Sequence, residues 1–306
     1  MSVEELIKAA NIYSELHDKN TARLVINKDK IIDTNVVPGL AVDAMEIKDG
    51  VDINIVLKEN ITIEKPVHLC FGVTHKEAIQ KIIMNINIGQ NSVVSIFAHC
   101  IFPNAVDVKH VMDGKIKVGR GAKYSYFERH IHSEEGGITV IPKARIILEE
   151  DARFKTEFEL IRGRVGSIDI DYETTCGSHS VMEMITRISG RGDDIVNVKE
   201  TGLLVGERAK GVLTSRIALR QNAKAQVYNK LVAMGDYARG HVDCQEIIQD
   251  NAVASAIPIV EVGNPKAHIT HEASIGSVDS KQLQTLMARG LSETEAVELI
   301  IAGLLK

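Results

Sequence analysis

Tryptophan is absent from this chain of 306 residues, and Phe, Trp and Tyr together make up only 4% of it. An enzyme that acts on polysaccharides would need paired carboxylates and, beside them, aromatic platforms for the sugar rings. The sequence also lacks a phosphate loop, a GxSxG nucleophile motif, an HExxH zinc motif and a dinucleotide-binding fingerprint. These absences argue against the common hydrolytic and nucleotide-dependent active sites, and they make a polysaccharide-active enzyme the weaker alternative.

Cysteine is scarce and dispersed. The four cysteines form no CxxC pair, which fits free thiols in a reducing compartment better than a disulfide framework. No apolar run reaches the 18 residues of a membrane span, and the acidic start Met1-Ser-Val-Glu-Glu does not resemble a secretion signal. The formal net charge of −5 argues against nucleic acid as a partner. We therefore expect a cytoplasmic protein that binds neither membrane nor nucleic acid.

A short sequence motif recurs along the chain: a polar or glycine-rich turn, then a small residue, then a run of residues typical of a β-strand. In the C-terminal half the small residues are Ala209, Ala223, Ala238 and Ala252, at steps of 14, 15 and 14. Earlier turns recur at twice that interval, at Ser92, Ala122 and Ala152. Such self-similarity indicates a repeat architecture with a full period near 30 residues.

Two strands and two turns fit into one such period. The run from Val212 to Ile217 alternates in the manner of a strand, so pairs of helices are excluded as the repeating unit. Coils of this size are typical of a β-solenoid, in which each coil pairs only with its neighbours. The sequence predicts an all-β core that forms a right-handed parallel β-helix.

Helical segments are expected on both sides of this core. A capping box at Ser2-Val-Glu-Glu5 predicts an N-terminal helical region within residues 1–20, and the β-helix then spans 21–277. Residues 278–306 predict a helical hairpin. Its first helix is capped by Asp279 or Ser280 and stopped by Gly290, and a second capping box begins at Ser292. Composition alone favours a hairpin that covers the open end of the solenoid.

Histidines and cysteines are the candidate metal ligands. His130 and His132 lie on one strand face, but with no third ligand in view we interpret them as two exposed histidines. His99 and Cys100 point to opposite faces, so they cannot share a metal locally. The Cys176-Gly-Ser-His179 turn is a weak candidate for a metal site, because the sequence shows no second pair of ligands to go with it.

Towards the end of the array, Cys244 and Glu246 share one strand face, and Asp243 lies on the other. A thiol in this position is either a small core residue or a soft metal ligand. His268 and His271 fall on opposite faces of the next strand, so they do not form a chelating pair. His271 alone could supply a ligand to a site shared between subunits.

Two C-terminal elements carry a recognisable pattern: the run from His271 to Gly276 reads HEASIG, and the run from Ala288 to Glu293 reads ARGLSE. Both resemble the SufB/SufD family of the SUF iron–sulfur cluster assembly system. The motifs from Lys199 to Gly202 and from Ile257 to Glu261 support the likeness. The resemblance covers residues 150–306 by motif and the earlier half by architecture. This chain is shorter than typical family members.

The resemblance implies a non-catalytic scaffold that dimerises through its C-terminal coils. It also implies that the terminal helices bind an ABC-type ATPase, SufC, which favours docking over capping for the hairpin. The residues expected to contact the ATPase are Leu283, Leu286, Met287 and Leu291.

The resemblance further implies a transient iron–sulfur cluster at the dimer interface. His271 matches the family's interface histidine, whereas the partner cysteine, expected near Ala252, is missing. We therefore predict a variant metal site made of His271, Cys244 and Glu272. A flavin is possible in the family, but nothing in the sequence supports one. A homodimer, a SufB/SufD-type heterodimer and a purely structural SUF partner without a cluster site all stay open.

Overall fold

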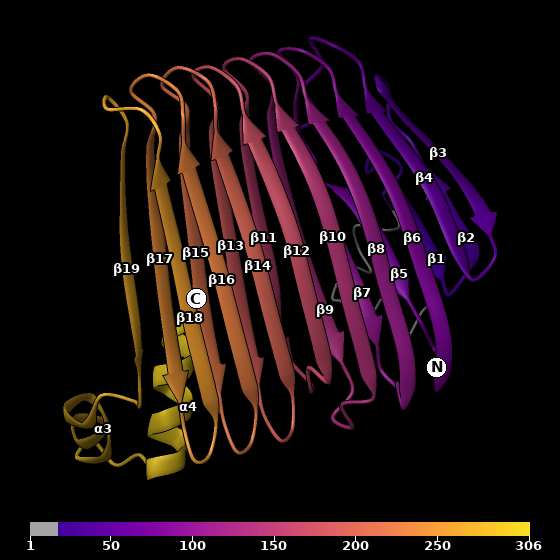
Figure 1. Cartoon of the computed structure of the whole chain (residues 1–306). Helices are drawn as coiled ribbons and strands as arrows, with labels where there is room; N and C mark the ends of the chain where they lie inside the picture. Colours follow the sequence, from indigo (N-terminus) through magenta and orange to yellow (C-terminus); the bar gives the residue numbers. More distant parts are fainter. Residues whose placement is uncertain (1–17) are drawn as a thin grey trace.

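A computed structural model describes residues 18–306 of the chain (Figure 1). The N-terminal helix predicted within residues 1–20 falls almost entirely outside this range. The described part is dominated by strands, and it contains two helices, α3 and α4, both at the C-terminal end.

Nineteen strands follow one another with only short turns between most of them. Their bounds are β1 Arg23–Asn27, β2 Lys30–Asn35, β3 Leu40–Ile47, β4 Gly50–Leu57, β5 Val67–Gly72, β6 Glu77–Ile88, β7 Val93–Phe102, β8 Asp107–Val118, β9 Lys123–His132, β10 Ile138–Leu148, β11 Arg153–Arg162, β12 Ser167–Cys176, β13 Val181–Gly190, β14 Ile195–Leu204, β15 Lys210–Leu219, β16 Lys224–Ala233, β17 Arg239–Ile248, β18 Val253–Val262 and β19 His268–Gly276.

From β4 onward, consecutive strands alternate between two sheets. One sheet has ten strands in the order β19-β17-β15-β13-β11-β9-β7-β5-β1-β2, and the other has nine in the order β18-β16-β14-β12-β10-β8-β6-β4-β3. From β4 onward each strand pairs in parallel with the strand two places away along the chain. The chain therefore winds as a solenoid with the two sheets as its walls, and the predicted parallel β-helix is confirmed (Figure 1).

Alternation along the strands fills the space between the sheets. In β15, Leu213 and Ile217 are fully buried between the walls, while Thr214 and Arg216 face outward. Residues 30 apart in sequence stack on neighbouring coils, as when Ser125 Oγ donates to Ser95 Oγ at 2.7 Å. Burial of one contiguous Val, Ile, Leu and Ala core supplies the main driving force for folding.

The recurring alanines lie at the corners of the coils. The backbone N–H of Ala209 donates to Gly206 O (3.3 Å), and that of Ala238 donates to Gly235 O (3.2 Å). Just before these alanines, Arg208 and Tyr237 have φ values of 55° and 59°. A small side chain fits the buried corner, and a residue in the left-handed backbone conformation allows the chain to turn there. These two requirements explain the composition of the repeated motif.

The two ends of the solenoid differ. At the N-terminal end each sheet finishes in an antiparallel hairpin, β1–β2 in one wall and β3–β4 in the other. At the C-terminal end, β18 pairs only with β16, and β19 pairs only with β17, within the described chain. The interior positions of these last strands are partly or fully exposed, so this end is open.

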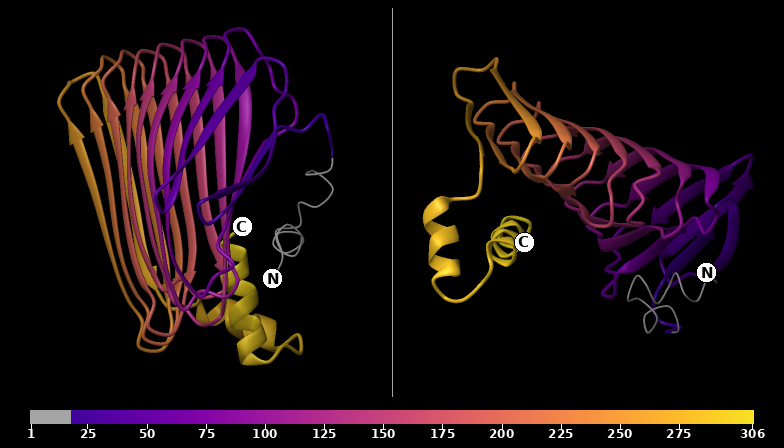
Figure 2. Two further views of the ribbon diagram at one scale, coloured as in Figure 1. Left: turned by 90° about the vertical axis from the view of Figure 1, so that its right-hand side faces the viewer. Right: turned by 90° about the horizontal axis from the view of Figure 1, so that it is seen from below.

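The helical hairpin has the predicted caps. Helix α3 (Ser280–Met287) begins at Asp279, whose side chain accepts a hydrogen bond from the Gln282 backbone at 2.7 Å. Helix α4 (Glu293–Leu304) begins at Ser292 with a complete capping box. Figure 2 shows both helices at one side of the solenoid, near the lower ends of its strands in the left view.

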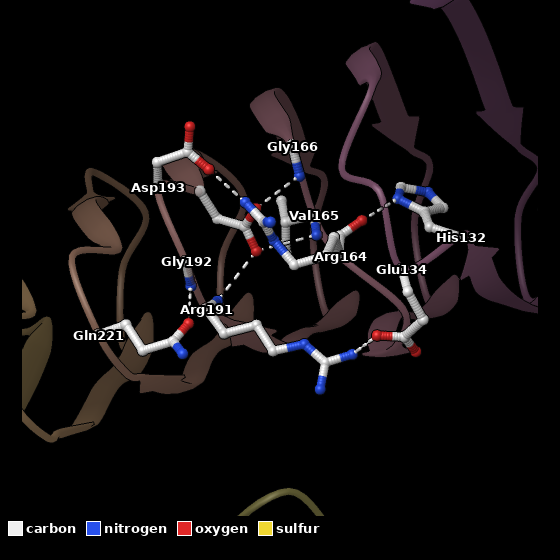
Figure 3. A network of polar contacts seen from close by, with 10 residues as sticks. His132, Glu134, Arg164, Val165, Gly166, Arg191, Gly192, Asp193 and Gln221 are labelled. Atoms are coloured by element: carbon white, nitrogen blue, oxygen red, sulfur yellow. Dashed lines mark hydrogen bonds and ion pairs between the residues drawn. The ribbon is translucent and has the colours of Figure 1, made fainter. Parts of the chain in front are cut away.

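A buried carboxylate takes the place of the corner alanine at Asp194. The side chain is fully buried, and it accepts hydrogen bonds from the backbone N–H groups of Arg191 (2.9 Å), Val165 (3.0 Å) and Gly166 (3.0 Å). The guanidinium of Arg164 donates a further bond at 2.9 Å (Figure 3). Asp194 thus joins the turns of two adjacent coils.

We predict that Asp194→Ala lowers the free energy of unfolding by about 3 kcal/mol, because it leaves the buried backbone N–H donors without an acceptor and removes the buried carboxylate that pairs with Arg164. Urea denaturation followed by circular dichroism measures the effect. Asp193→Ala is the matched control: its carboxylate also bonds Arg164 but is 93% exposed, so little change is expected. Equal losses in the two variants would contradict this role of Asp194.

Candidate functional site

Cys244 lies on the inner face of β17, and Glu246 lies two residues further along the same face. The Asn229 amide donates to Cys244 Sγ at 3.5 Å, and Ser215 Oγ donates to Glu246 Oε1 at 3.3 Å. The expected sharing of one face by Cys244 and Glu246 is confirmed. Burial raises the pKa of the Cys244 thiol, which therefore keeps its proton in the free protein.

Further polar side chains line the interior next to this thiol. Ser215 is the register neighbour of Cys244, and Glu200 is that of Asn229. Thr186 Oγ1 donates to Glu200 Oε1 at 2.7 Å. Near Cys244, three buried oxygens accept no hydrogen bond from the described residues: Glu200 Oε2, Asn229 Oδ1 and Glu246 Oε2. The interior of the last coils is therefore polar and rich in lone pairs.

His271 lies on β19, the last strand of the array. Its register partner on β17 is Val242, an inward-facing residue, so His271 belongs to the same inner face as Cys244. The register partner of Cys244 is Ala273, two residues beyond His271. Ordinary sheet dimensions then separate the Cα atoms of Cys244 and His271 by about 8 Å. His271 is exposed because no coil covers it.

Glu272 points the other way. It is in register with Asp243, which faces outward and forms an ion pair with Arg216. Within one chain, the structure therefore brings Cys244 and His271 to one face and places Glu272 on the opposite face. Ala252, near the expected position of the missing cysteine, lies in the turn before β18.

The hairpin packs on the flank of the ten-stranded sheet, not over the open end. Ile301 and Leu305 bury against Ala218 and Ile247, which face outward from β15 and β17. Leu283 is partly buried in the same cluster. The hairpin is thus tied to the last coils, while their edges stay uncovered (Figures 1 and 2).

The other expected contact residues form an accessible apolar surface. Leu286 and Leu291 are half-buried, Met287 is exposed, and Leu299 of α4 adds a further exposed apolar side chain. A groove of about 570 Å³ lies between the two helices, and its lining includes Leu286, Leu299 and Ile300. A partner could therefore contact this surface without displacing the packing of the hairpin.

The interpretation of His130 and His132 as exposed histidines is wrong. Both are buried inside the solenoid, because the even-numbered positions of β9 face inward. His130 lies beside Glu128 of the same strand and Cys100 of β7, and the ligand atoms of these three residues lie within 4.8 Å of one another. The sequence does not reveal this group, because Cys100 is 30 residues away from His130 and only the strand register places it one coil earlier, beside Glu128 and His130.

His99 and Cys100 have separate surroundings, as their opposite faces predict. His99 Nε2 lies 3.3 Å from His68 Nδ1, whereas Cys100 Sγ lies 3.9 Å from both His110 Nε2 and Glu128 Oε1. The four cysteines are all free and buried. Among residues 18–306, no helix is long and apolar enough to cross a membrane.

Comparison with known proteins places this architecture in a family. The family model described as "SUF system FeS cluster assembly, SufBD core domain" matches residues 72–304. An iron–sulfur cluster assembly SufBD family protein of Pyrococcus horikoshii is 40% identical over 301 residues, which cover 98% of this chain and 92% of that protein. The chain belongs to the SufBD family. The resemblance found in the C-terminal motifs is thereby confirmed.

Other SufBD relatives agree. A protein of that name from Methanocaldococcus jannaschii is 38% identical over 306 residues, covering 98% of this chain and 96% of its own length. Another, from Archaeoglobus fulgidus, is 25% identical over 248 residues and covers 80% of this chain and 65% of itself. Membership of the SufBD family supports a role in iron–sulfur cluster assembly. It gives no support to the alternative of a polysaccharide-active enzyme.

The buried Glu200 makes stability depend on pH. Burial raises its pKa to about 7, above the ordinary value of 4.5. Between these values the folded state keeps a proton that the unfolded state has lost, so the contribution of Glu200 to stability falls as pH rises through this window. Glu200→Gln should therefore be more stable than the wild type at pH 8, by up to about 3 kcal/mol, and similar to it near pH 4.5.

Denaturation midpoints across this pH range test the prediction. Glu207→Gln, at an exposed turn, is the control and should follow the wild-type curve. If Glu200→Gln follows the wild-type curve as well, the buried carboxyl is not the source of the pH dependence.

Proposed function

We propose that this SufBD protein is a non-catalytic scaffold that holds iron and sulfide at the open C-terminal end of its solenoid. The observation that carries the proposal is the position of Cys244 and His271 on one inner face of the last two strands of a sheet, at an end that nothing covers in residues 18–306. Iron and sulfide are here the cargo, and the nascent cluster is transient.

The donor set suits this cargo. Thiolate is a soft ligand and imidazole a borderline one, and both bind iron in clusters. The unpartnered oxygens of Glu200 and Glu246 would add hard donors to the same interior. We leave Glu272 outside this set, because it faces away from Cys244 and could reach a shared ion only through a different surface.

The open edges favour assembly with a second chain. β18 and β19 are the last strands of their sheets, and exposed edges of this length invite pairing. End-to-end contact between two copies would bury the edges and bring two sets of Cys244 and His271 together. We propose that this assembly is a homodimer. The alternative is a heterodimer with a related SufBD chain, and a mass measurement of the complex distinguishes the two.

The hairpin would dock an ABC-type ATPase of the SufC kind. Leu286, Met287 and Leu299 offer it an accessible apolar surface, and Ile301 anchors that surface to β15 and β17. A movement of the ATPase would thus be transmitted to the coil that carries Cys244. The four free cysteines favour work in a reducing compartment, the cytoplasm.

Anaerobic reconstitution with iron and sulfide tests the cluster site. The wild type should develop the visible absorbance of an iron–sulfur cluster, and both Cys244→Ala and His271→Ala should lose most of it, because each removes a ligand. His268→Ala is the matched control, since it removes a histidine from the outer face of the same strand. Full absorbance in both ligand variants would refute the site and favour a purely structural role.

Co-purification with the ABC-type ATPase tests the docking surface. Leu286→Asp should weaken the complex by about 30-fold, equivalent to roughly 2 kcal/mol, because it places a charge in an apolar contact. Ile147→Asp is the control, since it changes an exposed apolar residue of β10 far from the hairpin. A complex that persists unchanged with Leu286→Asp would show that the ATPase binds elsewhere.

A further inference from the structure

A second group of ligand-type side chains lies deep in the N-terminal half of the solenoid. Cys100 on β7 and His130 on β9 are register neighbours in one sheet, and His110 reaches them from β8 in the opposite sheet. Glu128 completes the group from β9. All four are about 1% exposed. Cys100 Sγ lies 3.9 Å from Glu128 Oε1 and from His110 Nε2, and His130 Nε2 lies 2.7 Å from Glu128 Oε1.

Hydrogen bonds fix the tautomer of His130. The carbonyl oxygen of Arg164 can only accept, so His132 Nδ1 must donate to it, at 2.9 Å. His132 Nε2 is then an acceptor, and His130 Nδ1 donates to it at 3.1 Å. The lone pair of His130 Nε2 is therefore directed at the carboxylate of Glu128. Two acceptors face each other at 2.7 Å, and they require a cation or a proton between them.

The tautomer of His110 is fixed in a similar way. The amide nitrogen of Gln80 donates to the carbonyls of Lys28 (2.8 Å) and Gly72 (3.2 Å). Gln80 Oε1 is thus left to accept from His110 Nδ1, at 2.9 Å. The lone pair of His110 Nε2 is then directed at Cys100 Sγ. Both imidazoles therefore carry an unprotonated nitrogen next to this group, His110 Nε2 beside Cys100 and His130 Nε2 beside Glu128.

The surroundings hold these groups rigidly. Arg164, whose carbonyl orients His132, is itself held by Asp193 and Asp194 (Figure 3). The rings of Phe102 and Phe158 pack against His130, with centroids 6.1 Å and 4.8 Å away. Histidines oriented by carbonyl or amide oxygens inside an apolar shell are typical of metal ligands.

We propose that Cys100, His110, Glu128 and His130 bind one divalent transition-metal ion of the Zn²⁺ or Fe²⁺ class inside the solenoid. Ligands of a tetrahedral ion lie roughly 3.4–3.7 Å apart for bonds of about 2.0–2.3 Å. The two 3.9 Å separations are close to this range, and the contact between Glu128 and His130 needs to open by less than about 1 Å. One thiolate, one carboxylate and two neutral imidazoles neutralise a divalent charge, as a buried site requires.

The acid–base properties agree with this donor set. Burial lowers the pKa of His110 and His130 to about 3, so both rings are neutral at physiological pH. Burial raises the pKa of the Cys100 thiol well above its usual value and that of Glu128 to about 7. Without an ion, protons would occupy these two groups, and binding of the ion would release them.

The site is separate from the one proposed at the open end. Cys244 lies on β17 and Cys100 on β7, with the intervening coils between them. Because the four ligands are buried, the ion would enter during folding and exchange slowly afterwards. It would join three strands from both walls, so its effect is expected on stability rather than on delivery of a cluster.

Metal analysis of the purified chain is the first test. The protein should contain about one Zn²⁺ or Fe²⁺ per chain, which a chelator removes quickly only after unfolding. Refolding of the apoprotein with Co²⁺ should then give the absorption of a tetrahedral ion and a thiolate-to-metal charge-transfer band. A wild type that neither retains metal nor yields this band with Co²⁺ would overturn the proposal, whatever the variants do.

Variants assign the ligands. Cys100→Ser should abolish the charge-transfer band, and Glu128→Gln should weaken Co²⁺ binding by at least about tenfold. Cys176→Ser, another buried thiol, and Cys244→Ala should both keep the band, which separates this site from the cluster site. Circular dichroism confirms that each variant folds. A band that survives in folded Cys100→Ser would also overturn the assignment.

Discussion

The stacking of one coil on the next is the constraint on which the rest of the structure depends. Parallel pairing in register places each side chain directly over the residue about 30 positions away, so one choice of inward residue affects two neighbouring coils. Where the stacked inward side chains are apolar, they form the continuous core. Where they are polar, they form clusters. In the ten-stranded sheet, for example, Thr186, Ser215 and Cys244 are in register on three adjacent strands.

This constraint also makes the two ends special, because an end coil lacks one neighbour. The N-terminal end is finished by two antiparallel hairpins, which blunt both sheets. The C-terminal end keeps bare edges at β18 and β19, while the helices that follow are fixed to the flank instead. A solenoid that leaves one end open, with His271 displayed on its inner face, is suited to meeting a second chain there. The proposed assembly role follows from this asymmetry.

Much of the fold could be predicted from the sequence. The spacing of Ala209, Ala223 and Ala238 predicts the coil, because a buried corner in each turn admits only a small side chain. The caps at Asp279 and Ser292 were also predictable, since they depend on local hydrogen bonds.

The environment of single polar residues was harder to predict. The sequence alone suggests an exposed His130, because two of its ligand-type neighbours, Cys100 and His110, lie on other strands and only the fold brings them together. Glu272 is adjacent to His271 in sequence, but alternation along β19 puts it on the other face. The repeat period in the sequence is therefore enough to predict the architecture. To predict which residues make up a site, one must also know which residues of each strand face inward and how neighbouring strands are aligned.

The central claim is that iron and sulfide are held where Cys244 and His271 meet at the open end. Anomalous diffraction at the iron edge, from crystals of the protein loaded with iron and sulfide under anaerobic conditions, tests it most directly. We expect strong iron density beside Cys244 and His271, at a contact between two chains related through β18 and β19. Iron density absent from that face, or confined to the surroundings of Cys100 and Glu128, would contradict it.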